Sequence, residues 1–159
     1  PAGAVVISRD VARRLDRRSW QTYSTFRGHP LTVAAILAHL RIQARDRLHE
    51  HAAAMDAVVA DRLAGIAARH PSVRRVDGRG LHWTIELHGD DWRTWTGVSA
   101  EPPVASQVST AALAAGALIG TSGERGSLFL APPLIIEEKH LRRLLDILDE
   151  ALVVADRQL

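Results

Sequence analysis

Histidine and cysteine are the residues to examine first for metal or nucleophilic chemistry. Cysteine is absent, which excludes a thiolate nucleophile, a disulfide framework and a zinc–thiolate site. His49 and His51 are two residues apart in a helical pattern, so their side chains do not share a helix face. His82 and His88 fall on one face of a strand, but the strand rise separates them by about 20 Å. The sequence therefore predicts no metal site.

Lysine is the other residue type whose presence would carry covalent chemistry. Lys139 is the only lysine, and it follows Glu137 and Glu138 at the expected start of the last helix. A lysine amine becomes a nucleophile when burial or a neighbouring cation suppresses its charge. Two adjacent acids on an exposed first turn do the opposite. Lys139 is therefore expected to be protonated and is a poor candidate for catalysis.

Hydroxyl side chains gather in residues 17–30, which show neither helix nor strand periodicity and read as a long loop of functional type. Ser24 and Thr25 lie here, followed by Phe26 and Gly28. In the absence of other information such hydroxyls satisfy backbone groups of the loop. Glu86 is expected on the polar face of its strand, where a solvated acid is the default.

The composition excludes several classes of protein. Of the 159 residues, 47% are hydrophobic and 24% are charged, as in ordinary soluble domains, and no apolar run is long enough to cross a membrane. The 20 basic residues are all arginine apart from Lys139, and they are interleaved with 18 acids, which indicates solvated helix faces rather than a nucleic-acid-binding stripe. No signal peptide is visible, and a cytoplasmic location is expected.

The elements that would position these residues follow from periodicity. Residues 2–8 are apolar and β-branched, which predicts a buried strand, and a short helix follows to residue 16. Pro30 predicts a helix start, and apolar residues then recur at helical spacing as far as Ile66, as one long helix or two with a bend. Strict alternation predicts a half-buried strand over 81–87. Further along we expect a loop at 89–103, a helix at 104–115, strands at 117–121 and 127–131, and a helix at 137–156 with Leu141, Leu144, Leu145, Leu148 and Leu152 toward the core.

This order of elements predicts an α/β or α+β domain in which helices cover one sheet. The strand at residues 2–8 does not belong naturally to that sheet. It is interpreted as the remnant of a larger neighbouring domain.

Four segments in order resemble the class III, fold-type I pyridoxal-phosphate-dependent aminotransferases. Residues 25–30 read T-F-R-G-H-P and resemble the family's T-F/Y-x-G-H-P segment, which a long helix follows. Residues 1–8 are similar to the apolar strand behind the family's cofactor lysine, residues 80–87 resemble G-L-x-x-x-I-E-L, and residues 130–136 resemble A-P-P-L-x-I. Together they span nearly the whole chain.

The resemblance implies a C-terminal fragment of a homodimeric, pyridoxal-phosphate-dependent enzyme that moves an amino group between an amine or amino acid and a keto acid. Residues 1–30 would be the remnant of the large cofactor-binding domain, and residues 31–159 the small domain with the long interdomain helix. The Schiff-base lysine is expected upstream of Pro1, so the chain alone is expected to be inactive. Thr25 would donate to the cofactor phosphate of the other subunit, with Ser24, Phe26 and Gly28 beside it.

Two positions depart from the family pattern. Phe129 stands where many members place an arginine that grips a substrate carboxylate, and Asp77 stands in the arginine position of V-R-G-x-G-L. Arg125, in the turn before Phe129, could reach a carboxylate instead, although a solvated turn arginine is the default. The substrate therefore stays open, as do mutase and racemase chemistries.

A second hypothesis belongs to a different class of protein. A free-standing, non-catalytic α/β module that dimerises or binds a ligand would also fit the element order. Such a module would have no reason to keep the four ordered motifs, and the intact mass of the polypeptide separates the two hypotheses.

Overall fold

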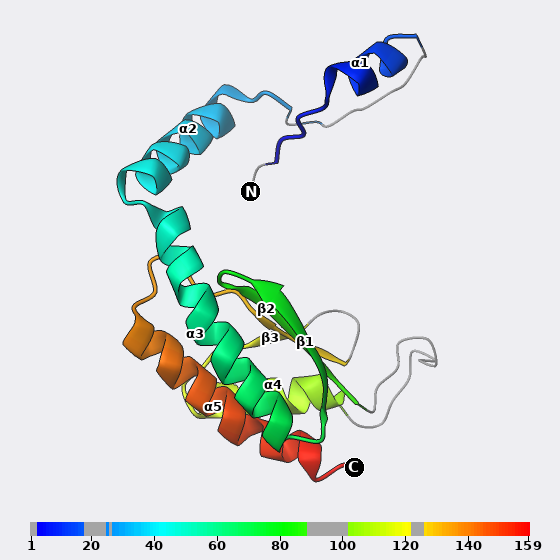
Figure 1. The fold of residues 1–159 in the computed structure, drawn as a ribbon, viewed down its shortest axis with the longest axis vertical. Coiled ribbons are helices and arrows are strands. Elements are labelled where there is room, and N and C mark those ends of the chain that lie inside the picture. The colour runs from blue at the N-terminus through cyan, green and yellow to red at the C-terminus, as the bar shows by residue number, and fades with distance from the viewer. Residues whose placement is uncertain (1–2, 18–24, 26, 89–101, 122–125) are drawn as a thin grey trace. The chain divides into compact units, whose positions relative to one another are not determined.

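The structure is a computed structural model that describes residues 3–17, 25, 27–88, 102–121 and 126–159 (Figure 1). The chain forms two compact units, Pro1–Asp46 and Arg47–Leu159. The boundary expected at residue 30 from the family resemblance concerns the domains of a longer protein, and it stays a prediction.

The first unit begins with a segment that is not a strand. Residues 3–8 have no regular secondary structure, and the side chains of Val5 and Val6 are 88% and 96% exposed. The expectation of a strand over 2–8 is therefore wrong for this chain, because an apolar strand forms only where a neighbouring strand supplies its hydrogen bonds. The short helix α1, Arg9–Leu15, follows as expected and begins where the Ser8 hydroxyl accepts a hydrogen bond from the Val11 amide.

Helix α2, Pro30–Arg45, completes the first unit. Pro30 occupies its first turn, and the preceding His29 is extended, with ψ 126°, as a residue before proline prefers. No residue of α2 is buried, and its larger apolar side chains include Leu31, Leu37 and Leu40, all exposed. Among the described residues of this unit, none buries these three leucine side chains.

The helical spacing predicted over residues 30–66 belongs to two helices. After α2 ends, Arg47 adopts a left-handed backbone conformation, with φ 51°, and α3 then runs over Leu48–Arg69. A non-glycine residue in that conformation cannot continue a right-handed helix. The second unit thus starts on a new helix.

The second unit is built on a four-stranded antiparallel sheet in the order β1-β2-β4-β3. Its strands are β1 Val73–Arg79, β2 His82–Leu87, β3 Gly120–Thr121 and β4 Ser127–Leu130. The alternation predicted for 81–87 is confirmed, since Ile85 and Leu87 are buried and His82 is exposed. The two later strands are present but shorter than predicted.

Three helices supply the other side of the core: α3, α4 (Val104–Ala114) and α5 (Glu138–Asp156). Helices α3 and α5 lie side by side and contact each other (Figure 1). Of the five leucines predicted to face the core from α5, four are buried and Leu144 is half-buried against it. Fully buried side chains of the three helices, including Leu63, Val108 and Leu148, share one hydrophobic core with Ile85 of β2.

The result is a small α/β domain with an antiparallel sheet, as the element order predicted. The helices cover one sheet face, and the side chains of the opposite face are exposed or half-exposed, among them Arg75, Asp77, His82 and Phe129. The loop predicted at 89–103 lies almost wholly outside the described residues, as does the turn at 122–125. No helix in the described part of the chain combines the length and apolarity that a membrane crossing requires.

Candidate functional site

The loop that precedes α2 presents one of the predicted site residues directly. Thr25 lies in a turn and its side chain is exposed. Ser24 and Phe26, which were predicted to stand beside it, lie outside the described residues. The Thr25 hydroxyl is therefore accessible to a ligand or to another protein chain.

Gly28 has the backbone conformation that its predicted role requires. Its φ is +70°, in the left-handed region that residues with a side chain rarely adopt, and a Cβ at this position would meet no atom within 4 Å. The glycine is therefore required by backbone conformation rather than by crowding. It turns the chain immediately before His29 and the start of α2, so that the loop and the positive end of the helix dipole are adjacent.

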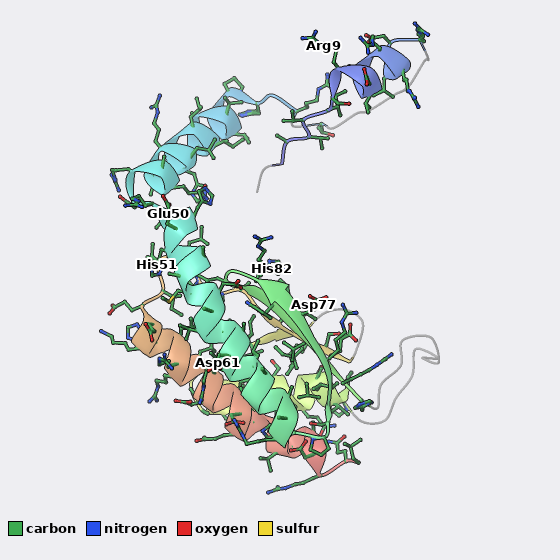
Figure 2. All side chains as sticks on the ribbon, in the orientation of Figure 1. Arg9, Glu50, His51, Asp61, Asp77 and His82 are labelled. Atoms are coloured by element: carbon green, nitrogen blue, oxygen red, sulfur yellow. The ribbon has the colours of Figure 1, made fainter. Side chains whose placement is uncertain are left out.

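Phe129 lies in a row of residues that crosses the sheet. It pairs with Thr84 of β2 on one side and with Gly120 of β3 on the other, and Thr84 in turn pairs with Asp77 of β1. The two positions that depart from the arginine pattern, Asp77 and Phe129, thus belong to one row on the face that no helix covers. Figure 2 labels Asp77 and His82 on the β1–β2 hairpin.

The His82 ring contacts the Phe129 ring. The two ring centroids are 4.6 Å apart and the ring planes meet at 85°, which is an edge-to-face contact. Asp77 pairs with Arg75 of its own strand. This ring contact could not be predicted from the sequence, because the two residues come from different strands and only the pairing register brings them together.

A groove of about 690 Å³ adjoins Phe129. Its walls come from residues 116–118, β3, β4, the 131–136 segment and α5, and they include Leu118, Phe129, Ile136, His140, Arg143 and Ile147. Most of this lining is apolar, with His140 and Arg143 as its charged or titratable members. His140 and Arg143 were not singled out from the sequence, where they look like ordinary solvated residues of an amphipathic helix. Arg125, the predicted carboxylate ligand, lies outside the described residues.

Lys139 has the surroundings that the sequence predicted. Its side chain is 69% exposed, and its Nζ lies 2.8 Å from the Glu137 carboxylate. Neither burial nor a neighbouring cation, the two features that activate a lysine amine as a nucleophile, is present around this exposed and paired side chain in the described residues. Within the described ranges, no group of three histidine or acidic side chains could hold a metal ion.

The chain is similar to known aminotransferases over most of its length. The family model described as "Aminotransferase class-III" matches residues 1–152. An alanine–glyoxylate aminotransferase 2 homologue of Arabidopsis thaliana is 30% identical over 150 residues, which cover 94% of this chain and 30% of that protein. A 4-aminobutyrate aminotransferase of Mycobacterium tuberculosis is 35% identical over 126 residues, covering 77% and 26% of the two chains. The chain thus spans about a third or less of the relatives it matches.

Solved structures of similar fold are also transaminases. The crystal structure of an S-selective transaminase from Arthrobacter sp. superposes with a TM-score of 0.74 at 24% identity, over 96% of this chain and 35% of that one. A transaminase from a study of directed evolution by ancestral reconstruction gives a TM-score of 0.73 at 30% identity, over 94% and 33% of the two chains.

Proposed function

The chain belongs to the class-III aminotransferase family, and from this we propose that it is the C-terminal part of a pyridoxal-phosphate-dependent enzyme that transfers amino groups between an amine or amino acid and a keto acid. The observation that carries the proposal is the family match over residues 1–152, which includes the Thr25–Pro30 loop. Residues 1–30 would be the end of the large cofactor-binding domain, and residues 31–159 the small domain.

The described residues fit the phosphate-binding part of a pyridoxal-phosphate site but not the part that holds the cofactor covalently. An exposed threonine hydroxyl, a glycine with φ +70° and the start of a helix of 16 residues make a suitable contact for a phosphate. The chain has no amine suited to holding the cofactor covalently, because Lys139 is exposed and paired with Glu137. The proposal therefore places that lysine upstream of Pro1.

Bound pyridoxal phosphate supplies the electron sink that amino-group transfer needs. The contribution of this chain is to hold and orient it. The Thr25 hydroxyl donates to a phosphate oxygen, and Gly28 lets the backbone turn beside that phosphate. In a homodimer, this loop would serve the active site of the opposite subunit, with Ser24 and Phe26 as its neighbours.

Phe129 is proposed to line the substrate pocket of the parent enzyme as an apolar wall. Its ring contacts the His82 ring edge to face, and the adjoining groove is mostly apolar. An apolar wall favours a donor whose side group carries no carboxylate, because burying an unpaired carboxylate there is costly. Arg125 remains a second proposed contact for a carboxylate.

Replacing Phe129 tests this assignment in the full-length parent. Phe129→Arg should lower KM for donors with a second carboxylate and raise it for apolar amines, since the guanidinium forms a paired contact with the former only. Phe129→Leu is the control that keeps an apolar wall. Unchanged relative kcat/KM values for the two donor classes in Phe129→Arg would remove Phe129 from the substrate pocket.

An amino-transfer assay tests the proposed function. The full-length parent, supplied with pyridoxal phosphate, a panel of amine donors and a keto-acid acceptor, should produce the amino acid of the acceptor. The 159-residue chain under the same conditions should produce none. Turnover by the chain alone, or a parent that transfers no amino group from any donor, would refute the proposal.

A further inference from the structure

His70 is a buried histidine at the end of α3, outside the residues discussed so far. Only 7% of its surface is exposed, and it is one of two buried polar residues in the described part of the chain, the other being Ser72. Its backbone amide closes the last turn of α3 on Ile66. A buried polar side chain needs hydrogen-bond partners, because leaving one unpaired is costly.

Both ring nitrogens of His70 face carboxylates of α5. Nδ1 lies 2.6 Å from Oδ2 of Asp156, and Nε2 lies 2.8 Å from Oδ1 of Asp149. An ionised carboxylate only accepts hydrogen bonds, whereas a neutral imidazole can donate from one nitrogen alone. With both carboxylates ionised, the two contacts can both be hydrogen bonds only if the ring carries two protons.

The same carboxylates are otherwise fully bonded, which indicates that they are ionised. Arg69 donates to the second oxygen of Asp149 at 2.7 Å, and the Ser72 amide and hydroxyl donate to the second oxygen of Asp156 at 3.2 and 2.5 Å. All four carboxylate oxygens therefore accept a hydrogen bond. The two negative charges on α5 thus face the Arg69 guanidinium and both ring nitrogens of His70.

The pKa values of the two carboxyl groups agree with this arrangement. Partial burial acts to raise the pKa of Asp149, but hydrogen bonds from His70 and Arg69 outweigh it and hold that pKa below its ordinary value. Burial likewise acts to raise the pKa of Asp156, and hydrogen bonds from Ser72 and His70 outweigh it, so this pKa is also lowered.

We propose that doubly protonated His70 is a proton-dependent clamp that ties the end of α3 to the C-terminal half of α5. Around the ring, α3 contributes Arg69, α5 contributes Asp149 and Asp156, and the connection to β1 contributes Ser72. Loss of the second proton would leave a nitrogen lone pair facing a carboxylate oxygen at hydrogen-bond distance, which is repulsive. The contact between that ring nitrogen and its carboxylate is then lost.

The sign of the pH dependence follows from which state binds more protons. The proposed clamp requires the folded chain to hold the second proton of His70 over a pH range in which the unfolded chain has lost it, so this contribution to stability is present at lower pH and lost at higher pH. The two aspartates act in the opposite direction: their lowered pKa values make a contribution that is lost as pH falls through them. The stability that the clamp contributes is therefore greatest at pH values above those at which the two aspartates become protonated and below those at which His70 would lose its second proton.

The first test is nuclear magnetic resonance of the ¹⁵N-labelled 159-residue chain, using long-range ¹H–¹⁵N spectra that distinguish protonated from bare ring nitrogens. At about pH 7.5, where exposed histidines are largely neutral, both His70 nitrogens should still be protonated. In Asp149→Asn, which keeps one carboxylate, the second proton should be lost at a lower pH. A wild-type His70 with one bare nitrogen at pH 7.5 would overturn the proposal.

The second test measures the folding equilibrium by urea unfolding between about pH 5 and pH 9. The ratio of the folding constants of wild type and His70→Gln should fall as pH rises, by up to about tenfold per pH unit where the ring titrates. His49→Gln, an exposed histidine of the same helix, is the matched control and should run parallel to wild type. Folding constants of wild type and His70→Gln that change in parallel with pH would also overturn the proposal. If His70→Gln does not fold, the spectra of wild type and Asp149→Asn decide.

Discussion

Thr25 is the residue to which the most specific functional role is assigned. A hydroxyl that donates to a phosphate contributes about 1.5–3 kcal/mol, because the acceptor is charged. Thr25→Ala in the full-length parent should therefore raise the dissociation constant of pyridoxal phosphate by about tenfold to a hundredfold, with the fold intact. The measurement is the absorbance of bound cofactor during titration, with dimer content followed by size-exclusion chromatography.

Two neighbouring substitutions make this prediction selective. Thr25→Val should behave like Thr25→Ala, because it also removes the donor while keeping the side-chain volume. Ser24→Ala should have a much smaller effect, because the proposal assigns the hydrogen bond to the phosphate to the Thr25 hydroxyl. Equal cofactor affinity of wild type and Thr25→Ala in an intact dimer would exclude Thr25 from the site.

The sequence motifs singled out candidate site residues, but they did not predict which side chains those residues contact in the fold. The T-F-R-G-H-P segment singled out Thr25 and Gly28, and the positive φ of Gly28 agrees with a backbone role. The ring contact between His82 and Phe129 could not be predicted, because it depends on the pairing of β2 with β4. The contacts of His70 could not be predicted either, because its partners Asp149 and Asp156 on α5 are 79 and 86 residues away in sequence.

Among the elements, the β1–β2 hairpin depends on one glycine. A Cβ on Gly78 would come within 2.4 Å of the His82 carbonyl oxygen and 2.6 Å of the Trp83 Cα, both backbone atoms that cannot move without disturbing the pairing. Gly78→Ala should therefore destabilise the second unit by at least about 1–3 kcal/mol, the usual range for overpacking. Urea unfolding followed by circular dichroism measures it.

Gly65 provides the matched control for this substitution. It lies within α3, and its added Cβ would meet only the end of the flexible Arg69 side chain, at 3.4 Å. Gly65→Ala should stabilise the unit by about 0.5–1 kcal/mol, because alanine is the better helix former. If Gly78→Ala proved as stable as wild type, the pairing of β1 with β2 would differ from the one described.

Local sequence signals predicted the types of several elements but not all of them: no pattern predicted the bounds of β1, although it pairs with β2 along its length. Pro30 marked the start of α2, alternation marked β2, and the leucine stripe marked α5. The break at Arg47 could not be predicted, since the apolar spacing continues through it and nothing in an arginine signals a positive φ. Residues 3–8 have strand composition without a strand, because propensity alone supplies no hydrogen-bond partner.

At the scale of the whole molecule, the chain exposes apolar side chains that a separate protein would be expected to bury. Leu31 of α2 is 75% exposed, and in the second unit Leu118 and Ile135 are 83% and 72% exposed. We predict that the isolated chain associates with itself in a concentration-dependent way and binds a dye that reports exposed apolar surface. Sedimentation velocity at several concentrations checks the association, and a monomer at high concentration without dye binding would count against a missing partner domain.

The central claim is that this chain belongs to a longer enzyme whose cofactor lysine lies upstream of Pro1. Borohydride reduction of the protein isolated from its natural source, after incubation with pyridoxal phosphate, followed by intact mass and peptide mapping, tests it most directly. We expect a polypeptide longer than 159 residues with the pyridoxyl group on a lysine in a peptide that precedes Pro1. A polypeptide of 159 residues carrying a stoichiometric adduct on Lys139 would contradict it.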